Sequence, residues 1–147
     1  MKLKLVIPLK PLSYNQYYRN TRSGKRVKTG AGLAYEEELE YLLSCRESSL
    51  LSFGKEFDPS KSIVKLDIEI FNPYFFRKAD GYLNPKSGDI DNSVKVLQDK
   101  IFKYANIDDS AVKKLTVTDW PSDRPGMIIT LDFKGFPTER VFPIELI

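Results

Sequence analysis

A group of aspartates around one lysine, in the second half of the chain, has a spacing that could bind a metal ion. Asp89 and Asp91 are separated by one residue where a loop enters an expected helix. Asp91, Lys95 and Asp99 then follow at intervals of four residues, an interval that places side chains on one side of a helix. The pattern predicts a row of charged groups along one helix face, with paired carboxylates at its start.

Two more aspartates, Asp108 and Asp109, follow just after the expected end of that helix. They reach the first pair only if the next strand runs back along the helix, which is about 20 Å long. In that case carboxylates converge in a protein that has no histidine, and an oxygen-only ligand set suits Mg²⁺ or Mn²⁺ rather than zinc or copper. Such an ion lowers the pKa of water and offsets charge on a phosphodiester, and Lys95 would be placed to hold a phosphate.

The alternative is that these aspartates serve local structure. Aspartates commonly cap helices, and an Asp–Lys pair four residues apart is often only a weak surface interaction. Two other binding motifs are excluded. A calcium loop starting at Asp89 would need glycine at Val94 and glutamate at Lys100, and no Gly-x-x-x-x-Gly-Lys-Ser/Thr loop occurs, so we expect no nucleotide cofactor.

The composition narrows the chemistry further. The 147 residues include one cysteine and no histidine, which excludes an internal disulfide framework, a cysteine-rich zinc site and Ser-His or Cys-His catalysis. The first residues alternate lysines with apolar residues, unlike a signal peptide. No stretch approaches the roughly 20 apolar residues that span a bilayer. We expect a cytoplasmic protein with no membrane partner.

The charge is unevenly distributed along the chain. Residues 1–35 contain eight Lys or Arg and no acid, whereas 15 basic and 20 acidic residues follow, so the net charge of +3 hides a basic arm and an acidic body. Such asymmetry indicates a polyanionic partner. Cations and aromatic rings suit contacts to phosphates and bases; the alternative is a solvated loop whose tyrosines cover the core. The candidates for DNA contact in this arm are Tyr17, Arg19, Arg22, Lys25, Arg26 and Lys28.

The expected elements form an α+β fold in a single domain over residues 1–147, with a mixed or antiparallel sheet and two main helices packed on it. Apolar periodicity predicts strands at Leu3–Ile7 and Val64–Ile70, helices at Ala34–Leu50 and Asp91–Ala105, and a hairpin of Leu115–Thr118 with Met127–Leu131. Glycine and proline predict a loop over 8–32, a polar break at Gly54–Ser60 and a loop over Asn72–Ser87. Asn106 is expected to end the second helix, and Val141–Ile147 to add an edge strand.

The acidic segment resembles the RusA-like Holliday junction resolvases. The resemblance rests on Asp89-Ile90-Asp91-Asn92-x-x-Lys95, then Asp99, then Asp108-Asp109-Ser110-x-Val112. Pro11-Leu12-Ser13-Tyr14-Asn15 is similar to that family's N-terminal Pro-x-Ser-x-Asn segment, so the likeness extends from about Pro8 to Val112.

The resemblance implies a small homodimeric, Mg²⁺-dependent endodeoxyribonuclease of recombination and repair, of the kind often carried by prophages. It would nick four-way or other branched DNA symmetrically and leave 5′-phosphate and 3′-hydroxyl ends, with Mn²⁺ expected to substitute. Asp89, Asp91 and Asp109 match the catalytic, metal-binding acids, and Lys95 matches the essential lysine. Asp99 matches a further acid, and Asp108 is the alternative third ligand. The further residues expected to contact DNA are Asn15 and Lys86.

One departure lies before the first acid, where relatives often have proline or a basic residue and this chain has Ser87-Gly88. Lys86 is the expected substitute contact. Two other functions stay open from the residues alone. One is a non-catalytic DNA-binding or regulatory protein of phage type, and the other is a nuclease that prefers forks or flaps.

Overall fold

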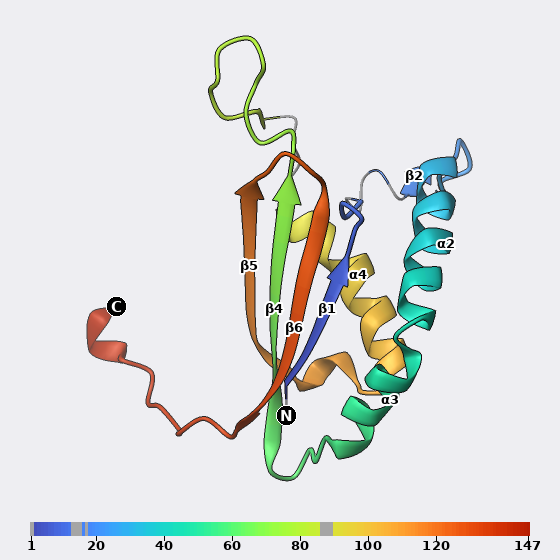
Figure 1. Ribbon diagram of the computed structural model, residues 1–147. Coiled ribbons are helices and arrows are strands. Elements are labelled where there is room, and N and C mark those ends of the chain that lie inside the picture. Colours follow the sequence, from blue (N-terminus) through green and yellow to red (C-terminus); the bar gives the residue numbers. More distant parts are fainter. Residues whose placement is uncertain (1, 13–15, 17, 86–89) are drawn as a thin grey trace.

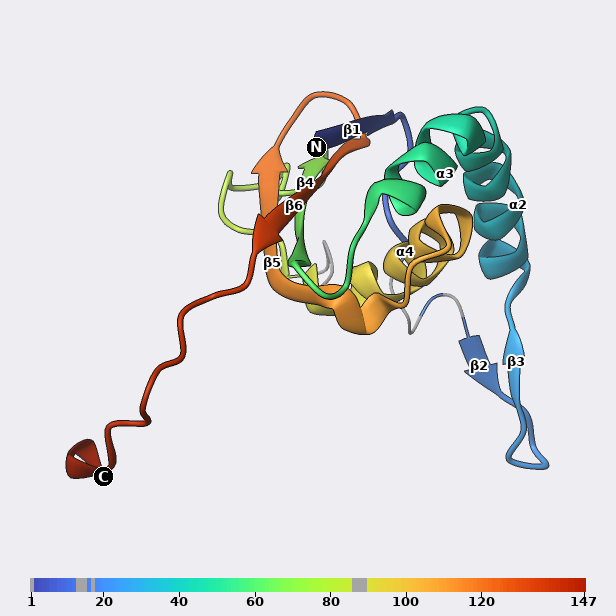
Figure 2. The same ribbon diagram turned by 90° about the horizontal axis from the view of Figure 1, so that it is seen from below.

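A four-stranded mixed sheet forms one layer of the protein, and the three α-helices of the described residues cover one face of that sheet (Figures 1 and 2). The computed structural model describes residues 2–12, 16, 18–85 and 90–147, and of residues 90–93 the backbone only. The strands lie in the order β1-β6-β4-β5. Their bounds are Lys2–Ile7 for β1, Ser62–Asn72 for β4, Val112–Pro121 for β5 and Gly126–Gly135 for β6. The predicted α+β class with a mixed sheet is confirmed.

Strand β4 is central because its alternating sequence gives it one fully apolar face. Val64, Leu66, Ile68 and Ile70 are all buried on the helix-covered side. Opposite them in β6 lie Leu131, Ile129 and Met127, which are also buried. The strands predicted at Leu3–Ile7 and Val64–Ile70 are confirmed.

Strands β5 and β6 do not form the predicted hairpin, because β4 lies between them. β5 pairs in parallel with β4, and β6 pairs antiparallel with β4 on the other side. Parallel neighbours need a crossover, and helix α4 (Ile90–Ala105) supplies it between β4 and β5. The crossover makes β5 an edge strand that returns along α4.

The helix predicted at Ala34–Leu50 is wrong as a single element, because two helices occupy this region. Helix α2 (Gly30–Ser44) and helix α3 (Glu47–Glu56) are separated at residues 45–46. Helix α2 also starts earlier than predicted, because Thr29 caps it: the Thr29 hydroxyl oxygen accepts a hydrogen bond from Gly32 N at 2.9 Å. Glycines typical of a loop therefore lie in the first turn of a helix.

The loop predicted over 8–32 also contains a short hairpin. Its antiparallel strands are β2 (Tyr18–Asn20) and β3 (Arg26–Lys28). Gly24, with φ of +81°, lies in its turn. This hairpin carries most of the basic arm and projects from the body beside the start of α2 (Figure 2).

Gly54 lies inside α3 and does not begin the predicted polar break. A Cβ atom at this position would lie 1.7 Å from the backbone oxygen of Ala105, the last residue of α4. Glycine is needed here for the close approach of the two helices. Helix α4 itself and its end at Asn106, which has φ of +55°, agree with prediction.

The hydrophobic core fills the space between the sheet and the helices. Leu39 and Leu43 of α2, Leu50 and Phe53 of α3, and Leu97 and Ile101 of α4 are fully buried against the sheet. At the far end of β4, the described part of the predicted loop extends beyond the sheet (Figure 1). Among the residues that the structure describes, no helix has the length and apolar character needed to cross a membrane.

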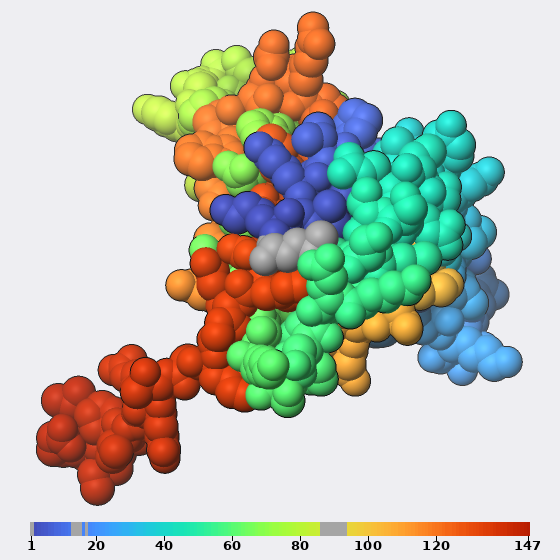
Figure 3. Space-filling view, turned by 60° about the horizontal axis from the view of Figure 1, so that its bottom comes forward, coloured from blue at the N-terminus to red at the C-terminus, as the bar shows by residue number. Residues whose placement is uncertain are grey.

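The C-terminal segment does not form the predicted edge strand. After Gly135 the chain has no regular structure until the short 3-10 helix η3 (Ile144–Leu146). Val141 and Ile147 are 91% and 92% exposed, and the segment stands clear of the body (Figure 3). Pro137 and Pro143 lack the backbone N–H that a ladder needs, so this stretch cannot continue the pairing of β6.

Truncation after Phe136 is therefore expected to leave the free energy of unfolding within about 0.5 kcal/mol of the full chain. The removed side chains bury little surface against the body, so few contacts are lost. Urea unfolding of the two proteins checks this. A larger loss of stability would show that the segment packs on the domain in solution.

Candidate active site on helix α4

One side of α4 is buried in the core and the other is charged and exposed. Leu97 and Ile101 are fully buried, whereas Lys95, Asp99 and Lys103 are exposed at intervals of four residues. Position 91 lies in the first turn of the same helix, one turn before Lys95. The predicted row of charged residues is confirmed for the part whose side chains are described.

Strand β5 returns along this charged side, as convergence of the two acidic segments requires. Lys95 and Asp99 of α4 line one cavity of about 320 Å³ with Asp109, the first residue of the short turn η2 (Asp109–Ala111). Leu115 and Val117 of β5 supply an apolar wall. The crossover thus brings Asp109 to the surface of Lys95 and Asp99, whereas its approach to Asp89 and Asp91 stays a prediction.

A neighbouring cavity of about 470 Å³ shares two of these acids. Asp99 and Asp109 line it together with Lys103, Asn106 and Asp108. Asp99 therefore contributes to the same surface as Asp109 in both cavities. This position favours a functional role for Asp99 beyond that of a solvated charge.

The two adjacent aspartates after α4 have different environments. Asp108 caps η2, since its Oδ1 accepts a hydrogen bond from Ser110 N at 2.9 Å. This bond from the backbone of Ser110 holds the pKa of Asp108 below its usual range. Asp109 lines the cavity that contains Lys95, and Asp108 is not among the residues that line it. The geometry favours Asp109 as the functional acid of the pair.

The donor set fits a hard divalent cation in its chemistry. Carboxylate oxygens are the ligands that Mg²⁺ and Mn²⁺ prefer, and the described acids of this surface expose them. Within the described part of the chain, no three acids lie close enough to hold a metal ion. Asp89 lies outside the described residues and Asp91 is described by its backbone only, so the predicted ligand set stays a prediction.

The base of the basic hairpin lies next to α4. Tyr18 and Lys28 of the hairpin line a cavity of about 230 Å³ with Asp99, Lys100 and Lys103 of α4. The other predicted DNA contacts of the hairpin are exposed: Arg19, Arg22, Lys25 and Arg26. The Arg26 guanidinium lies over the Tyr18 ring, 5.7 Å from its centroid. Asn15, Tyr17 and Lys86 lie outside the described residues.

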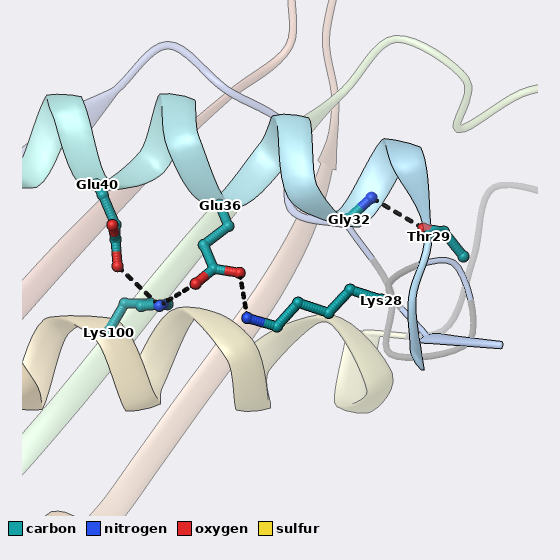
Figure 4. Close-up of polar contacts among 6 residues, drawn as sticks. All are labelled: Lys28, Thr29, Gly32, Glu36, Glu40 and Lys100. Atoms are coloured by element: carbon teal, nitrogen blue, oxygen red, sulfur yellow. Dashed lines mark hydrogen bonds and ion pairs between the residues drawn. The ribbon is translucent and has the colours of Figure 1, made fainter. Parts of the chain in front are cut away.

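A network of ion pairs joins the hairpin, α2 and α4 (Figure 4). Lys100 Nζ lies 2.7 Å from Glu36 and 2.8 Å from Glu40, and Lys28 Nζ lies 2.7 Å from Glu36. Sequence reasoning missed this network, because 64 residues separate Glu36 from Lys100.

Lys100→Met is expected to lower the free energy of unfolding by about 1 kcal/mol at pH 7. Burial alone would lower the pKa of Lys100, but Glu36 and Glu40 outweigh burial and raise it above the usual value of 10.5. A raised pKa stabilises the fold below the unfolded value and ceases to do so as pH rises through the folded one. The deficit of the variant should therefore shrink above about pH 10.5.

Urea unfolding between pH 7 and 11 measures this effect. Lys103→Met is the matched control, since Lys103 lies on the same helix and is exposed. An equal deficit in both variants at every pH would contradict the contribution of the ion pairs.

A known protein family matches most of the chain. The family model described as Endodeoxyribonuclease RusA matches residues 8–132. The match covers the basic hairpin, helices α2, α3 and α4, and the acids of α4 and η2, and it ends inside β6. No curated protein gives a significant match to the chain.

Proposed function

The chain belongs to the RusA endodeoxyribonuclease family, and from this premise we propose that it is a metal-dependent nuclease that resolves four-way or otherwise branched DNA by symmetric nicking. The observation that carries the proposal is the cavity in which Lys95 and Asp99 of α4 meet Asp109 of η2, because it gathers two acids and a lysine at one surface. If these aspartates only capped helices, they would not need to line one cavity together with a lysine.

In the proposed mechanism, Asp89, Asp91 and Asp109 hold Mg²⁺, and Mn²⁺ substitutes for it. When bound, such an ion makes water a stronger nucleophile and offsets charge that develops on the phosphate. Lys95 donates to a non-bridging oxygen of the scissile phosphate and stabilises the transition state. Asp99 lies at the same surface and is proposed to orient the side chains of Lys95 and Asp109 there. The products carry 5′-phosphate and 3′-hydroxyl ends.

The exposed cations of the β2–β3 hairpin are proposed to bind the DNA backbone. Contacts between these cations and DNA phosphates do not depend on base sequence, which suits recognition of a branched shape. Symmetric nicking of two opposed strands requires two active sites, so we propose a homodimer acting in recombination and repair. Light scattering at micromolar concentration tests the dimer, and a monomeric mass under those conditions would contradict it.

A panel of DNA substrates tests the function. Four-way junctions, forks, flaps and linear duplexes are incubated with the protein in Mg²⁺, Mn²⁺ or Ca²⁺, or with a chelator. We expect paired nicks in the four-way junction with Mg²⁺ and Mn²⁺ only, and nicks that DNA ligase can seal. Binding without nicking under every condition would instead show a non-catalytic DNA-binding protein. Faster cleavage of forks or flaps would reassign the substrate.

A further inference from the structure

We propose that Glu36 is a positioning residue that fixes the basic hairpin relative to the charged side of α4, and thereby sets where branched DNA is cut. The inference rests on the proposed nuclease function and extends it to a residue outside the acidic site. Glu36 contacts a lysine of the hairpin and a lysine of α4. It is thus a direct bridge between the group that would grip DNA and the helix that would cut it.

The hairpin depends on contacts at its base for its orientation. Its strands have three residues each, and an isolated two-stranded hairpin is at best marginally stable. At the base, the Thr29 hydroxyl donates to the Gln16 carbonyl at 2.6 Å and accepts from Gly32 N at 2.9 Å. The Lys28–Glu36 pair adds a second attachment to α2 at the end of β3. These contacts hold both strands of the hairpin at one end of α2.

The ion pair between Glu36 and Lys100 connects α2 to the part of α4 that carries the candidate active site. Lys100 lies between Glu36 and Glu40, and the side chains of Lys100 and Glu36 are only 16% and 17% exposed. An isolated surface ion pair contributes little, but this one is partly buried and each central group has two partners. Lys100 is adjacent in sequence to Asp99, which lines the cavities on both sides of it. A shift of this point of α4 would move the acidic surface relative to the hairpin.

Charge and position predict opposite effects when Glu36 is changed. Removing a carboxylate leaves Lys28 and Lys100 with less compensation, so electrostatics alone would tighten DNA binding. A positioning role predicts that the DNA sits less accurately at the site, and a misplacement of about 1 Å can cost up to about 100-fold in rate. The two effects can be separated in one variant.

The test compares Glu36→Gln with Glu38→Gln, which removes the same charge from an exposed position of α2. Incision sites in a four-way junction are mapped to the nucleotide, and kcat and KM are measured at several salt concentrations. For Glu36→Gln we expect incisions spread over neighbouring positions and kcat/KM reduced about tenfold. Glu38→Gln should cut at the wild-type position. Lys100→Met should reproduce the spread of incisions. Lys100→Arg, which keeps the charge, should cut at the wild-type position.

A second readout does not depend on cleavage. Hydrogen exchange of the backbone amides of 18–28 should accelerate in Glu36→Gln and not in Glu38→Gln, while amides of β4 stay protected in both. If the wild-type protein cuts no branched DNA, the proposed function fails, and exchange still decides whether Glu36 couples the hairpin to the body. Unchanged incision positions and unchanged exchange in Glu36→Gln would overturn the inference.

Discussion

Replacing Asp109 with asparagine is expected to reduce metal-dependent nicking of a four-way junction by at least about 100-fold. Changes to groups that merely support metal ligands cost 10- to 100-fold, and Asp109 is proposed as a ligand itself. Junction binding should persist or tighten, because the substitution removes a negative charge from a surface that faces a polyanion. Single-turnover rates in Mg²⁺ and binding in Ca²⁺ measure the two quantities separately.

Asp108→Asn is the matched control for this variant. Asp108 caps η2 through Ser110 N, and asparagine caps as well as aspartate, so the variant should fold normally and cut within a few-fold of wild type. A large loss in Asp108→Asn with a normal rate in Asp109→Asn would transfer the role to Asp108. Normal cutting by both variants would remove this turn from the site.

Gly54→Ala is expected to have the largest effect on stability, a loss of about 3 kcal/mol or more. The new methyl group would lie 1.7 Å from the Ala105 backbone oxygen, and a backbone atom at the end of a helix cannot rotate away as a side chain does. Helices α3 and α4 would have to separate, and neighbouring core side chains such as Phe53 would lose contacts. Urea unfolding measures the loss.

Gly30→Ala separates this steric effect from helix propensity. Gly30 is the first residue of α2, and a Cβ atom there would meet nothing within 4 Å. Alanine should therefore be neutral or stabilise the protein by up to about 1 kcal/mol. Similar losses in both variants would contradict the close contact between α3 and α4.

Strand β4 and helix α4 could be predicted from the sequence because their apolar residues repeat with a clear period. The α2–α3 region could not, since two consecutive amphipathic helices produce nearly the same pattern as one. Two wrong predictions, the extent of the loop over 8–32 and the break at Gly54, rested on glycine. Gly32 is buried within α2 and Gly54 lies at a helix contact, whereas local sequence associates glycine with loops and breaks.

The sequence predicted which residues could form the candidate site, but it did not predict their arrangement. The spacing of Lys95 and Asp99 predicted a shared helix side, and the structure confirms that both are exposed there. The place of Asp109 depends on which strand β5 pairs with, a property of the whole sheet. The contact of Glu36 with Lys100 depends on the packing of two helices, and no local pattern encodes it.

The parallel pairing of β4 with β5 has a consequence for the order in which the protein forms. Each strand's position relative to the other is fixed only through the whole crossover, and contacts between distant segments are slow to form. β5 has no hairpin partner that could hold it locally. The cavity shared by Lys95 and Asp109 includes Leu115 and Val117 of β5 in its wall, so it is complete only when β5 has paired with β4. A partly folded chain in which β5 is unpaired would therefore lack the complete candidate site, so cutting requires the finished sheet.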